Sequence, residues 1–177
     1  MTPPLHCEFP WGSVGRMYTW GAFRGARPDL AEAGRALLYQ FGGVGLAFLG
    51  TVRSDGGPRL HPMCPVLNGD GLYALLIPSP KARDLRRDPR YALHAFPPED
   101  DEDAIYLTGE VILREGDGDT ALRRSIDDQF LAERSMATRP PGFDDQTLVE
   151  FLIESCLLTR TTAHGDHDPQ HTIWHAP

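Results

Sequence analysis

Apolar segments separated by glycine-rich turns constrain the fold of this 177-residue chain more than any other feature of its sequence. Residues 46–52, 59–67 and 72–77 each have the length and apolar content of a strand. The connections between them, 54–57 and 68–71, read Ser-Asp-Gly-Gly and Asn-Gly-Asp-Gly, which are turn sequences. Because such short connections join strands that are neighbours in space, the sequence predicts an antiparallel meander.

The second of these strands contains Pro62 and Pro65, which is unusual for a strand. Proline has no N–H to donate to a neighbouring strand, so it is confined to edge strands and bulges. We therefore expect one side of this strand to be free or bulged.

The segment after the third strand has the sequence of a helix start and holds the one lysine of the chain. Ser79 is the expected N-cap of a helix over 79–88, and Pro80 suits its first position. The amides and dipole of a helix start favour an anion, and Lys81 adds a compact positive charge. This pattern indicates a phosphate site at Ser79 and Lys81. The competing interpretation is an ordinary capped helix with an exposed lysine.

The rest of the chain completes a mostly β protein with helical insertions. Apolar periodicity and flanking proline or glycine predict further helices at 28–41, 117–133 and 146–153. Further strands are expected at 91–96, 104–114 and 156–163, with a short final strand at 171–175. About six strands, mostly paired in chain order, predict an antiparallel β-barrel.

Residues 1–27 have no periodic pattern and are rich in glycine, proline and aromatic residues. We expect an irregular arm there. It contains too many aromatic side chains for a free tail, so it should pack on the body or on a second subunit. The length of the remainder, 28–177, fits a single domain with its own core.

The composition excludes several classes of protein. A formal net charge of −8 and a pI near 5.3 argue against a nucleic-acid binder, which would present a basic face. No segment approaches the roughly 18 apolar residues of a membrane span, and the first residues do not resemble a signal peptide. Three widely spaced cysteines with no CxxC pair indicate reduced thiols in a cytoplasmic protein rather than disulfides or structural zinc.

Over residues 46–96 the order of these features resembles the flavin-binding split-barrel superfamily of pyridoxamine 5′-phosphate oxidase. The proline-interrupted strand is followed by a turn, a strand, the sequence Ser-Pro-Lys-Ala-Arg-Asp-Leu, and then Asp-Pro-Arg-Tyr-Ala-Leu-His. The resemblance implies a six-stranded antiparallel split β-barrel. It also implies a homodimer that holds FMN, or a related deazaflavin coenzyme, in a groove between the subunits.

The resemblance also implies positions for the cofactor. The second strand would lie along the isoalloxazine ring, and the helix start after the third strand would hold the phosphate. The positions that match the ring-binding strand are His61, Pro62, Met63 and Cys64. The phosphate positions are Ser79, Lys81 and Arg83, and the approach to them would be lined by Ile77 and Pro78.

The chain departs from the oxidase itself at two places. The oxidase has an Arg-x-x-Leu-Leu-Lys pattern on the second strand, where its lysine helps to hold the phosphate of the substrate. Here His61 and Val66 occupy the arginine and lysine positions. The arginine-rich C-terminal strand of the oxidase is also missing, since the chain ends at 173–177 with Ile-Trp-His-Ala-Pro. The resemblance therefore implies the fold and the cofactor class, but not pyridoxamine phosphate as the substrate.

Several side chains have two interpretations. His61 is either a half-buried strand histidine or a contact to flavin, or a haem ligand, since relatives of this fold bind haem. Cys64 is a small core residue or a reactive thiol beside the cofactor. Trp174 either covers the cofactor from the partner subunit or merely packs. The histidines of the segment 164–171, with Asp166 and Asp168, form a solvated hairpin or a metal cluster.

The first functional hypothesis is a cytoplasmic, homodimeric FMN-dependent oxidoreductase that acts on an unknown small molecule. The second is a deazaflavin-dependent reductase, whose coenzyme has a long acidic tail. Arg83, Arg86 and Arg87 could bind that tail, although Asp84 and Asp88 dilute their charge. The third is a non-catalytic protein that stores or senses flavin or haem.

Overall fold

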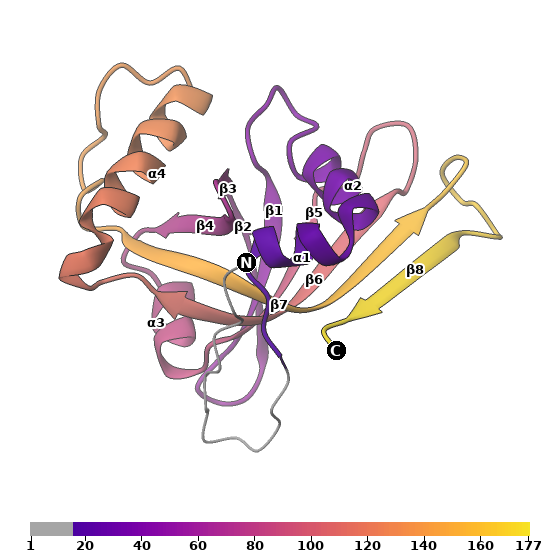
Figure 1. The fold of residues 1–177 in the computed structure, drawn as a ribbon, viewed down its shortest axis with the longest axis horizontal. Helices are drawn as coiled ribbons and strands as arrows, with labels where there is room; N and C mark the ends of the chain where they lie inside the picture. The colour runs from indigo at the N-terminus through magenta and orange to yellow at the C-terminus, as the bar shows by residue number, and fades with distance from the viewer. Residues whose placement is uncertain (1–15) are drawn as a thin grey trace.

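The computed structural model describes residues 16–177 and is built on a single antiparallel sheet (Figure 1). Its strands are β1 (Ala47–Val52), β2 (Pro58–Met63), β3 (Pro65–Asn68), β4 (Gly71–Leu76), β5 (Arg90–Ala95), β6 (Ala104–Leu113), β7 (Thr147–Arg160) and β8 (Gln170–His175). The helices in this part of the chain are α1 (Trp20–Ala26), α2 (Pro28–Leu38), α3 (Pro80–Arg87) and α4 (Thr120–Glu133), with a short 3-10 turn, η1 (Asp117–Asp119), before α4. No helix in the described range is long and apolar enough to cross a membrane.

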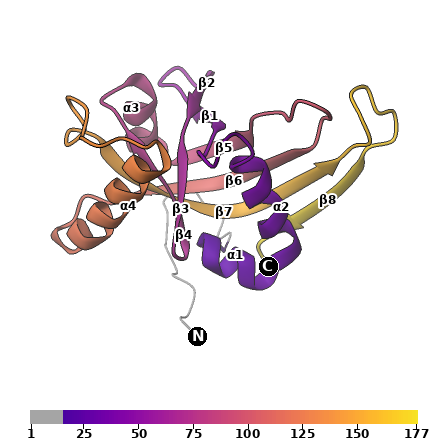
Figure 2. The same cartoon turned by 90° about the horizontal axis from the view of Figure 1, so that it is seen from above.

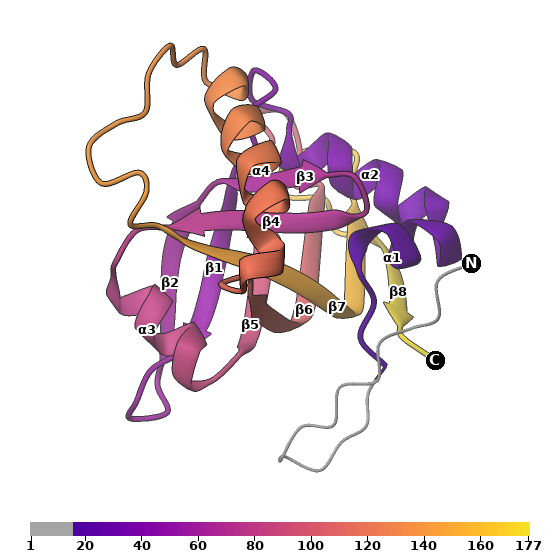
Figure 3. The ribbon, with the colours of Figure 1, turned by 60° about the vertical axis from the view of Figure 1, so that its left-hand side comes forward.

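The sheet curls into a half-barrel. Its strand order is β2-β1-β5-β6-β7-β4-β3, and β8 pairs with β7 outside this path. The two ends of the path, β2 and β3, are consecutive in the chain and are joined through Cys64. The chain therefore passes from one edge of the curled sheet directly to the other, which is the geometry of a split barrel (Figures 1 and 3).

The predicted count of six strands is wrong, because the sheet has eight. The single strand expected over 59–67 is two strands, since the backbone bends at Cys64 between Met63 and Pro65. The short final strand is present as β8 and pairs with β7 along its full length.

The helix predicted over 146–153 is also wrong, because these residues belong to β7, which begins at Thr147. β7 pairs with β6, with β4 at its start and with β8 at its end. The first half of β7 is buried on both faces, since Leu148 lies in the cluster with Ile126 of α4 and Val149 and Phe151 lie in the larger core cluster. A strand buried on both faces has no alternation of apolar and polar residues, and this pattern resembles a buried helix.

The main core lies between the inner face of the sheet and the pair α1–α2. It includes Phe23, Leu38, Leu49, Leu93 and Leu107, all of them fully buried. Helix α1 lies in the segment for which we expected an irregular arm, and its N-terminus is capped by the hydroxyl of Thr19. Trp20 and Phe23 pack into the core, as the aromatic content predicted, whereas residues 1–15, including Trp11, lie outside the described range.

A second, smaller core lies on the other side of β3 and β4, where α4 crosses these strands (Figure 3). Ile126 of α4 packs there with Val66, Tyr73, Phe143 and other apolar side chains. Gln129 ties the helix to the sheet, because its amide donates to the carbonyl of Leu67 at 2.8 Å. The strand β3 is therefore held between two cores.

Candidate functional site

The edge strand β2 has one partner, β1, and its other side is free within the described sheet. This confirms that the strand with Pro62 and Pro65 has an unpaired side. The carbonyl of Pro62 points to this free edge, since it accepts from Nζ of Lys81 at 3.3 Å. Alternation along an antiparallel strand then places the N–H and C=O of Leu60 on the same edge. The free edge thus offers one donor and two acceptors beside Lys81.

Helix α3 begins next to this edge (Figure 3). Ser79 is its N-cap and Pro80 follows at the first helical position, as the sequence predicted. The hydroxyl of Ser79, however, makes no capping hydrogen bond. Its Oγ atom is buried and has no hydrogen-bond partner in the described part of the chain. A buried hydroxyl without a partner is costly, so this atom is available for an external acceptor or donor.

Lys81 is half-buried at the first turn of α3. Burial lowers the pKa of its ammonium, and the nearby thiol of Cys64 acts weakly in the opposite direction. Cys64, at the bend between β2 and β3, is only partly exposed. The structure thus brings Pro62 and Cys64 close to Ser79 and Lys81, although the two pairs come from separate segments of the chain.

The cations of α3 differ in their partners. Arg86 forms a two-bond ion pair with Glu115, at 2.6 and 2.9 Å, and Arg87 lies 3.4 Å from the carboxylate of Asp84. Among residues 16–177, neither Lys81 nor Arg83 forms an ion pair with a carboxylate. Two positive charges near the start of the helix therefore remain for an external anion.

Asp84 makes contacts that the sequence did not reveal, since we interpreted it only as diluting the charge of α3. Its side chain is 4% exposed and faces the sheet. The carboxylate accepts from Nε of Arg59 on β2 at 2.6 Å and from Oγ1 of Thr51 on β1 at 3.1 Å. Burial raises the pKa of Asp84, but the bonds from Arg59 and Thr51 outweigh burial and leave the pKa below its ordinary value. Nothing in the local sequence marks this contact, because its partners are 25 and 33 residues away.

The remaining predicted positions do not all face one groove. His61 pairs with Leu49 and Met63 with Ala47, so both side chains point to the inner face, and Met63 is buried in the core. Pro62 points to the opposite face and is exposed. Ile77 and Pro78, between β4 and α3, are exposed, with Ile77 at 55%. A ligand at the free edge would therefore not meet the side chain of Met63.

Trp174 lies elsewhere in the chain. Its ring contacts Tyr18 edge-to-face and Phe23 at a tilt, with ring centroids 5.3 and 5.0 Å apart, and so it packs beside α1. Its strand, β8, is at the opposite end of the sheet from α3, as Figures 1 and 2 show. Within one chain Trp174 and Lys81 do not share a site.

The histidines near the C-terminus point to separate partners. Nε2 of His164 lies 2.9 Å from the carbonyl of Glu99, and Nδ1 of His171 lies 3.0 Å from the hydroxyl of Thr159. Residues 16–177 contain no group of three or more acidic, histidine or cysteine side chains placed to hold a metal ion.

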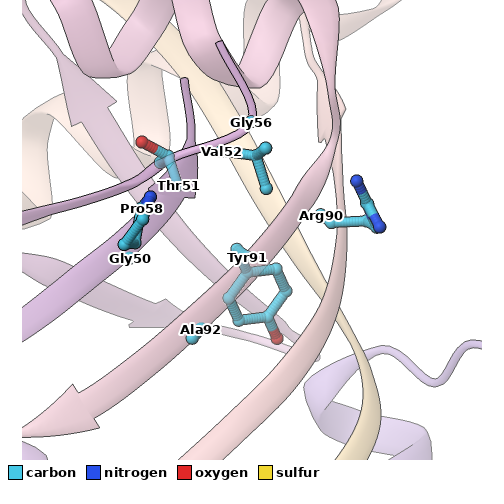
Figure 4. Close-up of a pocket in the computed structure, with 8 residues that line it drawn as sticks. All are labelled: Gly50, Thr51, Val52, Gly56, Pro58, Arg90, Tyr91 and Ala92. Carbon is cyan, nitrogen blue, oxygen red and sulfur yellow. The ribbon is translucent and has the colours of Figure 1, made fainter. Parts of the chain in front are cut away.

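Two cavities lie away from Lys81. One, of about 320 Å³, is a hollow where Gly50 and Ala92 leave the sheet without large side chains (Figure 4). The other, of about 390 Å³, lies between α2 and the turn after β3, beside Trp20 and Arg35. Neither of these two cavities is lined by Pro62, Ser79 or Lys81.

The sheet face opposite α1 and α2, here called the outer face, carries two complete cross-strand rows without a formally charged side chain. The rows are Leu60–Gly50–Ala92–Thr108–Ser155–His175 and Pro62–Phe48–His94–Tyr106–Leu157–Ile173. Leu60 is 67% exposed and Ile173 62% exposed. Neighbouring rows of uncharged residues that include exposed large apolar side chains are typical of a protein interface.

No family model and no curated protein matches the sequence. Solved structures do match the fold. A protein related to general stress protein 26, of the pyridoxinephosphate oxidase family, from Clostridium acetobutylicum has a TM-score of 0.58 at 14% identity, over 84% of this chain and 95% of that one. A NimC/NimA family protein from the same organism has a TM-score of 0.55 at 16% identity, over 83% and 93%.

A heme binding protein from Mycobacterium smegmatis is similar as well, with a TM-score of 0.55 at 18% identity over 79% of this chain. The match spans only 57% of the length of that protein. Identities at this level establish the fold alone. The fold is therefore shared with these structures, one of which is of the pyridoxinephosphate oxidase family, as the resemblance of residues 46–96 predicted.

Proposed function

We propose that this protein binds FMN where the start of α3 meets the free edge of β2, and that it is a flavin-dependent oxidoreductase acting on a small molecule. The observation that carries the proposal is the contact between Lys81 and the Pro62 carbonyl, at 3.3 Å. This contact places a lysine that has no carboxylate partner in the described chain beside a sheet edge whose backbone groups are unpaired.

The phosphate of FMN would be held by Ser79, Lys81 and Arg83. A phosphate monoester carries nearly two negative charges, and its burial requires charged or amide partners. Lys81 and Arg83 supply two positive charges that no carboxylate within residues 16–177 neutralises. The partnerless Oγ of Ser79 and the amides of the first helical turn can add hydrogen bonds.

The ring system would lie along the free edge of β2. The backbone of Leu60 and the carbonyl of Pro62 offer the alternating donor and acceptor groups that the polar edge of an isoalloxazine ring needs. Bound FMN would supply hydride transfer to or from the substrate, so the role of the chain is to bind, orient and shield. His61 and Cys64, which flank Pro62 and Met63 in the chain, are candidates for holding a proton.

The arginines of α3 favour FMN over a deazaflavin coenzyme. An acidic tail that continues past the phosphate would require further positive charge along the helix. Arg86 is already paired with Glu115, and Arg87 with Asp84. The charge that remains is enough for one phosphate monoester.

Pyridoxamine phosphate is not proposed as the substrate. Val66 stands where the oxidase has its phosphate-binding lysine, and it is fully buried in the core under α4. A side chain in that environment cannot contact a charged substrate group. The substrate class therefore stays open beyond a small molecule that stacks on the flavin.

The two uncharged rows of the outer face support a homodimer. A second copy that covered Leu60 and Ile173 would remove two exposed apolar side chains from water and would close the groove beside β2. We expect analytical ultracentrifugation to give twice the 19.6 kDa mass of the chain. Replacing Ile173 with arginine should shift the protein toward monomer.

Titration of the purified protein with FMN, riboflavin, a deazaflavin coenzyme and haem tests the cofactor proposal. FMN should bind most tightly, and its absorption bands should remain with the protein after gel filtration. Tighter binding of haem, with a Soret band that is lost in His61→Ala, would contradict the proposal. Oxidation of reduced nicotinamide by the FMN-loaded protein would separate an enzyme from a flavin carrier, which would show no turnover.

A further inference from the structure

Helix α3 is attached to β2 at two points. Asp84 accepts from Arg59 at 2.6 Å, and Lys81 donates to the carbonyl of Pro62 at 3.3 Å. On each element the two contacts are three residues apart, about one helical turn on α3. Together they fix the separation between the helix start and the free edge of the sheet, which is the space that the proposed flavin would span.

The two attachments differ in what a ligand would do to them. The ammonium of Lys81 would have to turn at least one of its donors toward an incoming phosphate. The carboxylate of Asp84 is buried and is also bonded to the hydroxyl of Thr51, which is itself 4% exposed. The Asp84 attachment therefore stays in place when Lys81 engages an anion.

We propose that Asp84 is a positioning residue for the phosphate group of the flavin. It acts by locking the start of α3 to β1 and β2 through Thr51 and Arg59, so that Lys81 and Ser79 keep the spacing that a bound phosphate requires. This inference rests on the proposed function, since it concerns the same site.

Whether Asp84→Asn strengthens or weakens FMN binding distinguishes a positioning role of Asp84 from a purely electrostatic one. Asp84→Asn removes a negative charge from the neighbourhood of an anion site and releases Arg59 and Arg87. On electrostatic grounds alone, the change should strengthen FMN binding. If Asp84 acts by positioning, the same change should weaken FMN binding, by about tenfold. Riboflavin, which has no phosphate, should bind both proteins equally.

Glu115→Gln is the matched control. It removes the same charge from the surroundings of α3, but its partner is Arg86, away from the contact with β2. We expect FMN binding to change by less than about twofold in this variant. Thr51→Val is a milder variant that keeps the carboxylate and removes one of its bonds. If Asp84→Asn does not fold, Thr51→Val should still weaken FMN binding and not riboflavin binding.

A double-mutant cycle completes the test. In a Lys81→Ala background, Asp84→Asn should weaken FMN binding by a smaller factor than it does in the natural protein, because one of the two groups that Asp84 positions has been removed. Tighter or unchanged FMN binding in Asp84→Asn alone, or an equal loss of FMN and riboflavin, would overturn the inference. If Lys81→Ala itself leaves FMN binding unchanged, it is the proposed function that fails.

Discussion

The two ends of α3 have opposite electrostatic arrangements. At its C-terminal end, Arg86 and Arg87 are paired with Glu115 and Asp84, so their charges serve the fold. At its N-terminal end, Lys81 and Arg83 have no carboxylate partner in the described range, and the hydroxyl of Ser79 has no hydrogen-bond partner. The difference teaches that an anion site is marked by the cations that the fold leaves unneutralised, rather than by the density of basic residues. Changes at the C-terminal end should affect stability, and changes at the N-terminal end should affect binding.

The largest effect is expected from Asp84→Ala. Loss of a buried carboxylate leaves Arg59 and Thr51 without their shared partner, and we expect a loss of about 2–3 kcal/mol in the free energy of unfolding. Urea unfolding of the flavin-free protein measures it. A loss below about 0.5 kcal/mol, the scale of a surface pair, would show that the network does not hold α3.

The second-largest effect is expected from Lys81→Ala, and it should concern FMN binding and not the stability of the fold. Lys81→Ala should weaken FMN binding by about 1–3 kcal/mol, the scale of a charge-assisted hydrogen bond. The midpoint of unfolding without flavin should stay the same, because the contact of Lys81 with Pro62 is partly exposed. Calorimetric titration with FMN and with riboflavin gives both affinities. An equal loss for the two ligands would remove the phosphate assignment.

Ser79→Ala tests the N-terminal end of α3 at its hydroxyl group. An N-cap serine usually contributes about 1 kcal/mol to stability, but the hydroxyl of Ser79 makes no capping bond. We therefore expect no loss of stability in the flavin-free protein and a loss of about 1 kcal/mol in FMN binding. A destabilised protein with unchanged FMN affinity would mean that the hydroxyl caps the helix in solution.

The free energy of unfolding should depend on pH in part through the ionisation of Asp84. Its pKa in the folded protein is below the ordinary value, because the bonds from Arg59 and Thr51 outweigh burial. A carboxyl of this kind contributes stability above its unfolded pKa, about 3.9, and loses it as the pH falls through the folded value. The difference in unfolding free energy between the natural protein and Asp84→Asn should thus be constant near neutral pH and shrink below about pH 4. A difference that grows on acidification would contradict this assignment.

The smallest effect is expected at the C-terminal end of α3. Glu115→Gln breaks an exposed ion pair, so unfolding free energy should fall by less than about 0.5 kcal/mol. A thermal melt of this variant beside Asp84→Ala compares an exposed pair with a buried one. Equal losses in both would remove the distinction between them.

Local sequence signals predicted much of the fold. The turns at 54–57 and 68–71, the prolines of the edge strand and the Ser-Pro start of α3 all depend on backbone preferences of single residues, and each appears where it was expected. The prediction failed where tertiary burial decides the structure. Residues 147–153 are apolar on both faces of β7, and no local pattern separates such a strand from a helix.

The candidate site was predictable only in part. Ser79 and Lys81 were visible because they are adjacent in sequence, and their neighbour Pro62 was visible from the resemblance. Asp84 was not, since its function depends on Thr51 and Arg59, which only the fold brings near. Periodicity does place Trp174 on a strand, but its packing on Tyr18 required the structure.

A crystal structure of the protein with FMN is the most direct test of the central claim. The account predicts the phosphate within hydrogen-bond distance of Nζ of Lys81 and Oγ of Ser79, with the ring along the free edge of β2. FMN bound elsewhere, with the start of α3 in contact only with its own chain or with solvent, would contradict it.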